Sequence, residues 1–236
     1  MPLVQGMNAL AVAILAAGIP ITGGPISATK GFQVAAQTTN FVFLTRDAKP
    51  VDAEKNQRFL DETSQRLGVQ VVGQSAYYRY AWPEEIGFAI GTNAAGAALT
   101  TGEILSTREF DAHEIVHRVA LQLGDPGALF NEGLAVELGD HGRVANVKVD
   151  GLARKLVGRV PFRSLADRFL SLEPGVRYPL AGSFMRFLVK RHGLDKVTAF
   201  FRACGTKGEG RDARFAEQFG QSLDDAGSAW IASLRS

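Results

Sequence analysis

Two histidines four positions apart, His113 and His117, are the residues of this chain whose types and spacing indicate chemistry. On an α-helix, residues i and i+4 lie one above the other on the same face, so both imidazoles could bind one metal ion. Glu114, inside the same H-E-x-x-H pattern, would then lie beside the metal without binding it. A zinc ion with two histidine ligands and one carboxylate keeps a position open for water, and a neighbouring carboxylate can take the proton of that water as it attacks a carbonyl. The pattern therefore predicts hydrolysis of a peptide bond.

The residues around this pattern predict the helix that the chemistry needs. Asp111 is a suitable N-cap, no Gly or Pro occurs between Ala112 and Leu123, and a Gly-Asp-Pro-Gly run then ends the helix. Apolar side chains around most of its circumference predict a helix buried in a domain. These are Ile115, Val116, Val119, Ala120 and Leu123.

A third metal ligand is expected beyond the turn that follows this helix, and Glu132 supplies it. From His117 to Glu132 there are 132 − 117 = 15 positions, enough to finish one helix, turn, and begin a second whose first turn faces back. Glu137 and His141 follow soon after. Either could orient a ligating histidine by accepting a hydrogen bond from its other ring N–H, or they are a helix-surface glutamate and a loop histidine.

The pair HEIVH and NEGLAVEL resembles the gluzincin metallopeptidases, and the short spacing between them is similar to the small bacterial peptidase MA-like families. Two later segments, YPLAGSFMRFLVKRHG and FAEQFGQSLDDAGSAWIASL, resemble the same families, so the likeness covers residues 40–236. The resemblance implies a zincin-like fold, zinc as the cofactor, a peptide or protein substrate, His113, His117 and Glu132 as zinc ligands, and Glu114 as the general base. A zinc-binding domain that does not hydrolyse its partner is the alternative.

The resemblance also suggests Tyr178 as a second catalytic residue. Attack on a carbonyl builds negative charge on its oxygen, so a hydrogen-bond donor is expected across the cleft from the metal. Aminopeptidases of the gluzincin clan have a catalytic tyrosine shortly before a glycine-containing helix, and here Tyr178 precedes Pro179, a suitable first helical residue, and Gly182. The alternative is a ring packed against the start of that helix.

A peptide substrate of a zincin-type site adds as a strand to the edge of the sheet next to the active helix. The strand nearest in sequence is Gly96-Ala97-Ala98-Leu99, whose small side chains leave room for another backbone. These residues are the predicted substrate-binding strand. Tight packing of an ordinary strand would explain the same residues.

The predicted fold class is α+β, with a small mixed sheet and the active-site helix in a first lobe and helices in a second. One metallopeptidase domain is expected over residues 37–236, with lobes divided near residue 124. The patterns predict strands around Phe41–Phe43 and over Val69–Val72, Ala76–Tyr80, Ile86–Ile90 and Gly96–Leu105, with a helix over Asp52–Leu67. Seven helices are predicted near or after Glu132: Leu129–Leu138, Leu152–Val157, Leu165–Leu170, Gly182–His192, Asp195–Cys204, Asp212–Phe219 and Leu223–Leu234.

Composition excludes some function classes. The formal net charge is only +2, and no dense Lys/Arg stripe interleaved with aromatics occurs, so nucleic acid is not an expected partner. The single cysteine, Cys204, excludes an intramolecular disulfide and any zinc site built from several cysteines. The sequence does not indicate an oligomeric state.

An apolar run of 13 residues at 9–21 is too short to span a bilayer comfortably but suits the core of a signal peptide. Small residues at Ile26-Ser27-Ala28 or Val34-Ala35-Ala36 could end it, which predicts a signal peptide or membrane-proximal segment over residues 1–36 and an exported protein. Membrane association is expected only through this segment. The alternatives are an uncleaved segment or a buried strand, and a cytoplasmic protein if the run is not a signal.

Overall fold

The computed structural model describes residues 30–46, 48–91, 94–205 and 210–235, which form two compact units. The first, here called the sheet unit, holds the described residues up to Arg58 together with Val72–Asp111. The second, here called the helical unit, holds Phe59–Val71 and the described residues from Ala112 onward. The helix that carries the H-E-x-x-H pattern therefore belongs to the helical unit, and its predicted place in the first lobe with the sheet is wrong.

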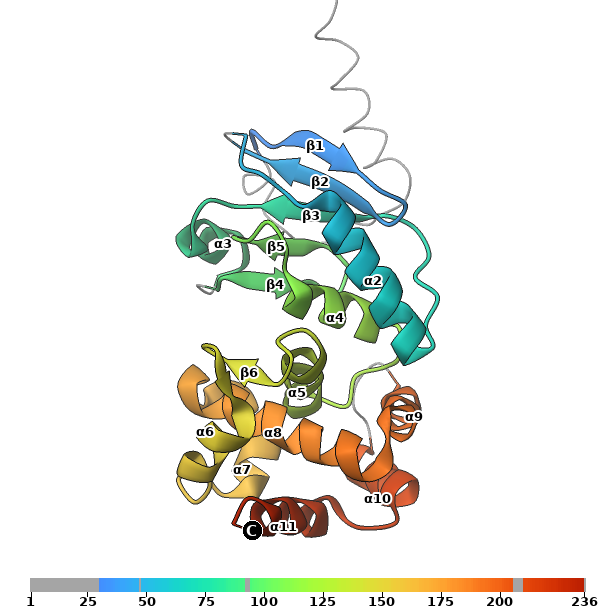
Figure 1. The fold of residues 1–236 in the computed structure, drawn as a ribbon, viewed down its shortest axis with the longest axis vertical. Helices are drawn as coiled ribbons and strands as arrows, with labels where there is room; N and C mark the ends of the chain where they lie inside the picture. The colour runs from blue at the N-terminus through green and yellow to red at the C-terminus, as the bar shows by residue number, and fades with distance from the viewer. Residues whose placement is uncertain (1–29, 47, 92–93, 206–209, 236) are drawn as a thin grey trace, which may run out of the picture. The chain divides into compact units, whose positions relative to one another are not determined.

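The sheet unit is built on one five-stranded mixed sheet, whose strands follow one another in Figure 1 in the order β1-β2-β3-β5-β4. The three central strands, β2, β3 and β5, are parallel, and the edge strands β1 and β4 are antiparallel to their neighbours. The strands are β1 (Gln33–Gln37), β2 (Phe41–Thr45), β3 (Ser75–Arg79), β4 (Gly96–Ala98) and β5 (Ile104–Ser106). Parallel neighbours need a crossover, which α2 (Ala53–Leu67) provides between β2 and β3, and α3 (Pro83–Ile90) between β3 and β5.

Aromatic side chains fill the core of this unit. Phe41, Phe43 and Tyr77 are fully buried, and the rings of Phe41 and Tyr77 lie 5.4 and 5.3 Å from that of Phe43. The Tyr77 hydroxyl donates to the Arg108 carbonyl at 2.8 Å, so its one polar atom is satisfied. The central strand β2 is buried at four of its five positions, as expected for a strand covered on both faces.

Two predicted strands are wrong. Val69–Val72 forms no strand, and Ile86–Ile90 is part of the helix α3. Pro83 is the first residue of α3, and the Glu85 side chain accepts hydrogen bonds from the backbone N–H groups of Ala81 and Trp82, so local capping selects the helix. The predicted strand over Gly96–Leu105 is two short strands, β4 and β5, paired as a hairpin.

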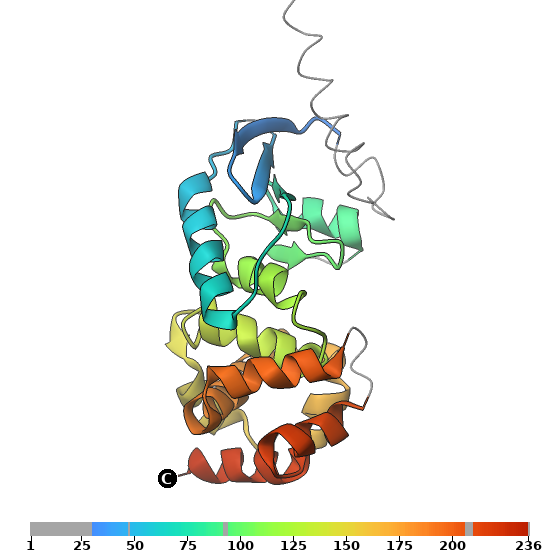
Figure 2. The same cartoon turned by 90° about the vertical axis from the view of Figure 1, so that its right-hand side faces the viewer.

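The helix α8 is the centre of the helical unit and lies between α5 and α11 in Figure 1. Figure 2 shows the C-terminal helices α10 and α11 next to each other. Eight residues of α8 are buried, because helices pack on more than one of its sides. The elements are α4 (Ala112–Ala120), α5 (Ala128–Leu138), β6 (Arg143–Val144), β7 (Val147–Lys148), α6 (Val149–Leu156), α7 (Phe162–Asp167), the 3-10 turn η2 (Phe169–Ser171), α8 (Pro174–His192), α9 (Leu194–Cys204), α10 (Arg211–Phe219) and α11 (Leu223–Ser233).

The predicted α+β fold, with a small mixed sheet and a helical second part, is confirmed. Six of the seven predicted helices occur, although α8 begins at Pro174 rather than near Gly182. The predicted helix Leu165–Leu170 is divided between the end of α7 and the 3-10 turn η2, and a short β6–β7 hairpin was not predicted. Pro179 lies inside α8, so it is not the first helical residue that the sequence suggested.

None of the described helices is both long enough and apolar enough to cross a membrane. The apolar run at 9–21 and the first candidate cleavage site at Ile26-Ser27-Ala28 lie outside the described residues. The second candidate, Val34-Ala35-Ala36, lies within β1, which pairs with β2.

Candidate metal centre

The helix α4 presents the two histidines on one side, as their spacing predicts. Ile115, Val116 and Val119 on its other sides are fully buried, which fixes the rotation of the helix. The side chains of His113 and His117 remain 13% and 16% exposed, and their Nε2 atoms lie 3.2 Å apart. The helix ends at Ala120, three residues earlier than predicted, because the chain tightens into i→i−3 turns up to Leu123.

The turn after α4 is built so that the next helix starts close to the histidines. The Asp125 carboxylate accepts hydrogen bonds from the backbone N–H of Gly127 at 2.8 Å and from the Asn131 amide at 2.7 Å. These bonds hold the first turn of α5, and Glu132 follows directly after that turn in the same helix. Gly133 then lets α5 approach α8, since a Cβ there would lie 2.7 Å from the Ala181 carbonyl oxygen.

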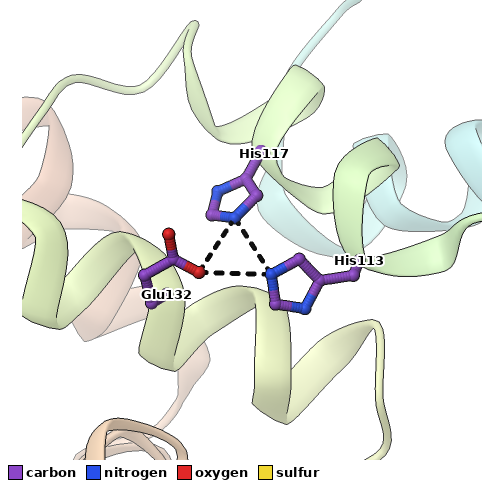
Figure 3. Close-up of side chains that lie close together, drawn as sticks. All are labelled: His113, His117 and Glu132. Carbon is purple, nitrogen blue, oxygen red and sulfur yellow. Dashed lines mark hydrogen bonds and ion pairs between the residues drawn. The ribbon is translucent and has the colours of Figure 1, made fainter. Parts of the chain in front are cut away.

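His113, His117 and Glu132 bring three ligand atoms together, as Figure 3 shows. The Oε2 atom of Glu132 lies 3.2 Å from His113 Nε2 and 3.4 Å from His117 Nε2, and the two Nε2 atoms are 3.2 Å apart. Zinc binds such atoms at about 2.0–2.1 Å, and a tetrahedron of that size has edges of about 3.3–3.4 Å. The three atoms therefore have the spacing of one face of a tetrahedral zinc site.

Asp140 orients one of the histidines. Its carboxylate accepts a hydrogen bond from Nδ1 of His113 at 2.7 Å, so Nε2 is the ring nitrogen that faces His117 and Glu132. Gly139 makes this contact possible, because a Cβ there would lie 2.8 Å from both the Ala112 carbonyl oxygen and the His113 Cα. The chain must pass this close to α4 for Asp140 to reach the imidazole.

The residues suggested from sequence for this orienting role do not fill it. Glu137 lies 3.5 Å from the Arg186 guanidinium, and His141 is exposed in the loop after α5. Asp140, directly before His141, was not predicted. The sequence signals such an orienting residue only by an ionisable group a short distance after the third ligand, and Glu137, Asp140 and His141 all fit that description.

The charges of the site favour a cation. Burial lowers the pKa of His113, but hydrogen bonds with Asp140 and Glu132 outweigh burial and raise this pKa to about 10. Burial raises the pKa of Glu132, but hydrogen bonds from His113 and His117 outweigh it and hold that pKa well below its usual range. Without a metal, a proton on His113 therefore balances the carboxylates at neutral pH, and a divalent ion would displace that proton.

Glu114 lies beside the triad. It is only 7% exposed, and its negative charge raises the pKa values of both His113 and Tyr178. A buried carboxylate this close to the ligands can accept a proton from a water between them.

Tyr178 also lies close to the triad. Its ring centroid is 6.3 Å from that of His113, and it packs against Phe169 at 6.1 Å and the Arg177 guanidinium at 5.2 Å. Burial raises the pKa of Tyr178, and the negative charge of Glu132 raises it further, so the hydroxyl keeps its proton at neutral pH. The residue lies within the first turns of α8, since that helix starts at Pro174.

The predicted substrate strand lies in the sheet unit. Gly96–Ala98 form β4, an edge strand of the sheet, and Leu99 starts the turn to β5. All four residues are half-buried. Their part in binding a substrate remains a prediction.

No protein-family model matches this chain, and no curated protein matches it. The fold and the geometry alone therefore define the site. The triad can hold one metal ion, and its H-x-x-x-H spacing on one helix with a glutamate on the next is consistent with a zincin-like site.

Proposed function

We propose that this protein is a zinc-dependent peptidase of the gluzincin type. The triangle formed by His113, His117 and Glu132 carries the proposal, because its edges of 3.2–3.4 Å fit a tetrahedral zinc site. The resemblance of HEIVH and NEGLAVEL to gluzincin metallopeptidases supports it.

The donor set favours zinc over other common divalent ions. Calcium and magnesium prefer sites made wholly of oxygen ligands, whereas two imidazoles with one carboxylate suit zinc. Three protein ligands also leave the fourth position for water or substrate, as in catalytic rather than structural zinc sites. A zinc ion here would polarise the scissile carbonyl and lower the pKa of a water.

The side chains of the helical unit supply the remaining steps. Glu114 takes the proton of the attacking water and then gives it to the leaving amine, which requires a carboxylate within reach of both. Tyr178 donates its hydroxyl hydrogen bond to the oxygen on which negative charge develops. Asp140 keeps the His113 ring in the tautomer and orientation that ligation needs.

The substrate is proposed to be an extended peptide that pairs with the edge strand β4. A proline cannot donate to a sheet hydrogen-bond ladder, so Ala98→Pro should weaken peptide binding at an unchanged zinc content. A variant with unchanged fold and unchanged KM would remove β4 from the substrate site.

Digestion of a broad peptide library tests the proposed activity. Cleavage that stops when a chelator is added, resumes with zinc and is absent in Glu114→Gln would support a peptidase. The substitution keeps the size of the side chain and removes its basicity, so zinc should stay bound. Saturable peptide binding with no cleavage by the zinc-loaded protein would instead favour the non-hydrolytic zinc-binding domain.

We also propose that the protein is exported, since the apolar run at 9–21 suits a signal peptide. The N-terminal sequence of the protein recovered from its native cells tests this. An intact Met1 on protein recovered from the cytoplasm would contradict it.

A further inference from the structure

The helical unit contains a pocket of about 410 Å³, lined by side chains from α6, α8 and α11. None of its lining residues belongs to the metal triad, and those on α8 begin at Ser183, beyond Tyr178. At 1.5 Å per residue, Arg186 in this pocket lies about 12 Å farther along α8 than Tyr178. The pocket is therefore distinct from the metal centre, and its size is that of small-molecule sites in proteins.

Positive charge dominates the lining of the pocket. Arg154, Arg186, Lys190 and Arg191 are basic, and Asp150 is the one acidic residue among the lining side chains. The lining therefore has a formal charge of 4 − 1 = +3, whereas the whole chain has only +2. Such a concentration of one sign in a concave surface attracts ligands of the opposite charge.

Existing ion pairs satisfy these cations only in part. The Nε atom of Arg186 is buried, lies 3.5 Å from Asp150 and has no hydrogen-bond partner among the described residues. The ammonium of Lys190 lies 3.9 Å from the same carboxylate. Arg186 also lies 3.5 Å from Glu137, which does not line the pocket. All three separations exceed the usual length of an N–H···O hydrogen bond, so the two carboxylates hold the two cations only loosely.

The other two arginines have no acidic partner within the described part of the chain. Arg154 donates from Nε to the Leu234 carbonyl at 2.7 Å, which holds its guanidinium in place. The Arg191 guanidinium lies 5.8 Å from the Phe187 ring centroid. Guanidinium groups held this way can offer their terminal N–H groups to an oxyanion as paired donors.

The floor of the pocket is aromatic and has its polar atoms satisfied. Trp230 is 2% exposed, and its indole N–H donates to the Ser183 hydroxyl at 3.1 Å. That hydroxyl donates to Asp150 at 2.8 Å. Trp230 therefore offers no free donor to a ligand, and the half-buried ring of Phe187 is the aromatic surface that an apolar group can contact.

We infer that this pocket binds a small organic anion. The phosphate or carboxylate group of this anion is held by Arg154, Arg186 and the exposed basic side chains Lys190 and Arg191, and its apolar part lies against Phe187. This inference does not depend on the metal centre or on peptidase activity.

Calorimetric titration of the full chain with phenyl phosphate, benzoate and inorganic phosphate at constant ionic strength tests it. We use zinc-loaded protein and protein treated with a chelator, so that anions captured by the metal are recognised. Phenyl phosphate is expected to bind both forms equally and at least tenfold more tightly than inorganic phosphate, because only the former carries a ring to bury. The comparison with benzoate shows whether the site prefers phosphate or carboxylate.

The double variant Lys190→Gln/Arg191→Gln should weaken the binding of phenyl phosphate at least tenfold. The matched control is Lys155→Gln/Arg159→Gln, which removes the same charge from exposed residues on and just after α6 that do not line the pocket. The control should stay within twofold of the parent. Equal weakening by both variants, equal affinity for phenyl phosphate and inorganic phosphate, or no saturable binding up to about 10 mM would each overturn the inference.

Discussion

Replacing Asp140 by asparagine tests how the metal centre is held. Asp140 accepts a hydrogen bond from His113 Nδ1 at 2.7 Å, and its side chain is 33% exposed. Asparagine has almost the same shape and can still accept that bond through its amide oxygen. The substitution therefore removes the charge of the partner while leaving the ring of His113 in place.

The size of the effect follows from the kind of bond. A hydrogen bond to a charged group contributes about 1.5–3 kcal/mol and a neutral one about 0.5–1.5 kcal/mol, so the loss of charge costs about 1–1.5 kcal/mol. Since about 1.4 kcal/mol corresponds to a factor of ten, zinc affinity should fall about tenfold in Asp140→Asn. Asp140→Ala removes the whole bond and should weaken zinc binding by about 10- to 100-fold.

Competition with a chelator of known affinity measures these changes at fixed pH. Asp195→Asn is a suitable control, because it removes an exposed carboxylate at the start of α9, outside the triad. The number of protons released on zinc binding, measured in buffers of different ionisation enthalpy, should also fall, since the pKa of His113 is held up by Asp140. Zinc affinity and proton release equal to those of the parent in both Asp140 variants would refute the orienting role.

Three further predictions concern the same site. The raised pKa of His113 stabilises the metal-free protein; this stabilisation is complete below pH 6.5, the pKa of an unfolded histidine, and is lost as the pH rises through about 10. The lowered pKa of Glu132 stabilises the protein above pH 4.5, the pKa of an unfolded glutamate, and this stabilisation is lost on acidification. Denaturant titrations of metal-free protein should therefore show both contributions to the free energy of unfolding in full between pH 4.5 and 6.5. A His113→Ala variant whose free energy of unfolding varied with pH as in the parent would contradict this. Gly139→Ala would place a methyl group against the backbone of Ala112. It should lower the free energy of unfolding by about 1–3 kcal/mol and weaken zinc binding. Unchanged values would mean that the end of α5 can move away from α4 at no cost. Tyr178→Phe should lower kcat by ~100-fold with zinc content unchanged, and a fully active variant would make Tyr178 a packing residue only.

The three proposed metal ligands were predictable because their arrangement depends mostly on local structure. His113 and His117 share a face of any helix that contains both, and the absence of Gly and Pro from Ala112 to Leu123 favours that helix. The position of Glu132 near the histidines could be predicted from a second helix that begins after the Gly-Asp-Pro-Gly turn. The close triangle of the three ligand atoms follows from these two helices and the turn between them.

Asp140 could not be predicted in the same way, because its contact depends on tertiary packing. Gly139 brings the end of α5 against the start of α4, and the sequence shows only a glycine followed by an aspartate and a histidine. Any of the ionisable residues from Glu137 to His141 could have reached the imidazole in a different packing.

Errors in the secondary structure have local causes. The run Ile86–Ile90 is apolar enough for a strand, but Pro83 and the two glutamates after it are signals for the start of a helix. The start of α8 was predicted too late because Pro179 suits the first position of a helix. Two prolines occur near the start of that helix, and the earlier one, Pro174, is the one at its first turn.

X-ray absorption spectroscopy of the zinc-loaded protein tests the central claim most directly, because it reports the atoms bound to the metal. The expected spectrum has two imidazole nitrogens and one carboxylate oxygen at about 2.0–2.1 Å, with the scattering of one imidazole lost in His117→Ala. A spectrum without imidazole scattering, or one unchanged by His117→Ala, would contradict the assignment of His113, His117 and Glu132 as the zinc ligands.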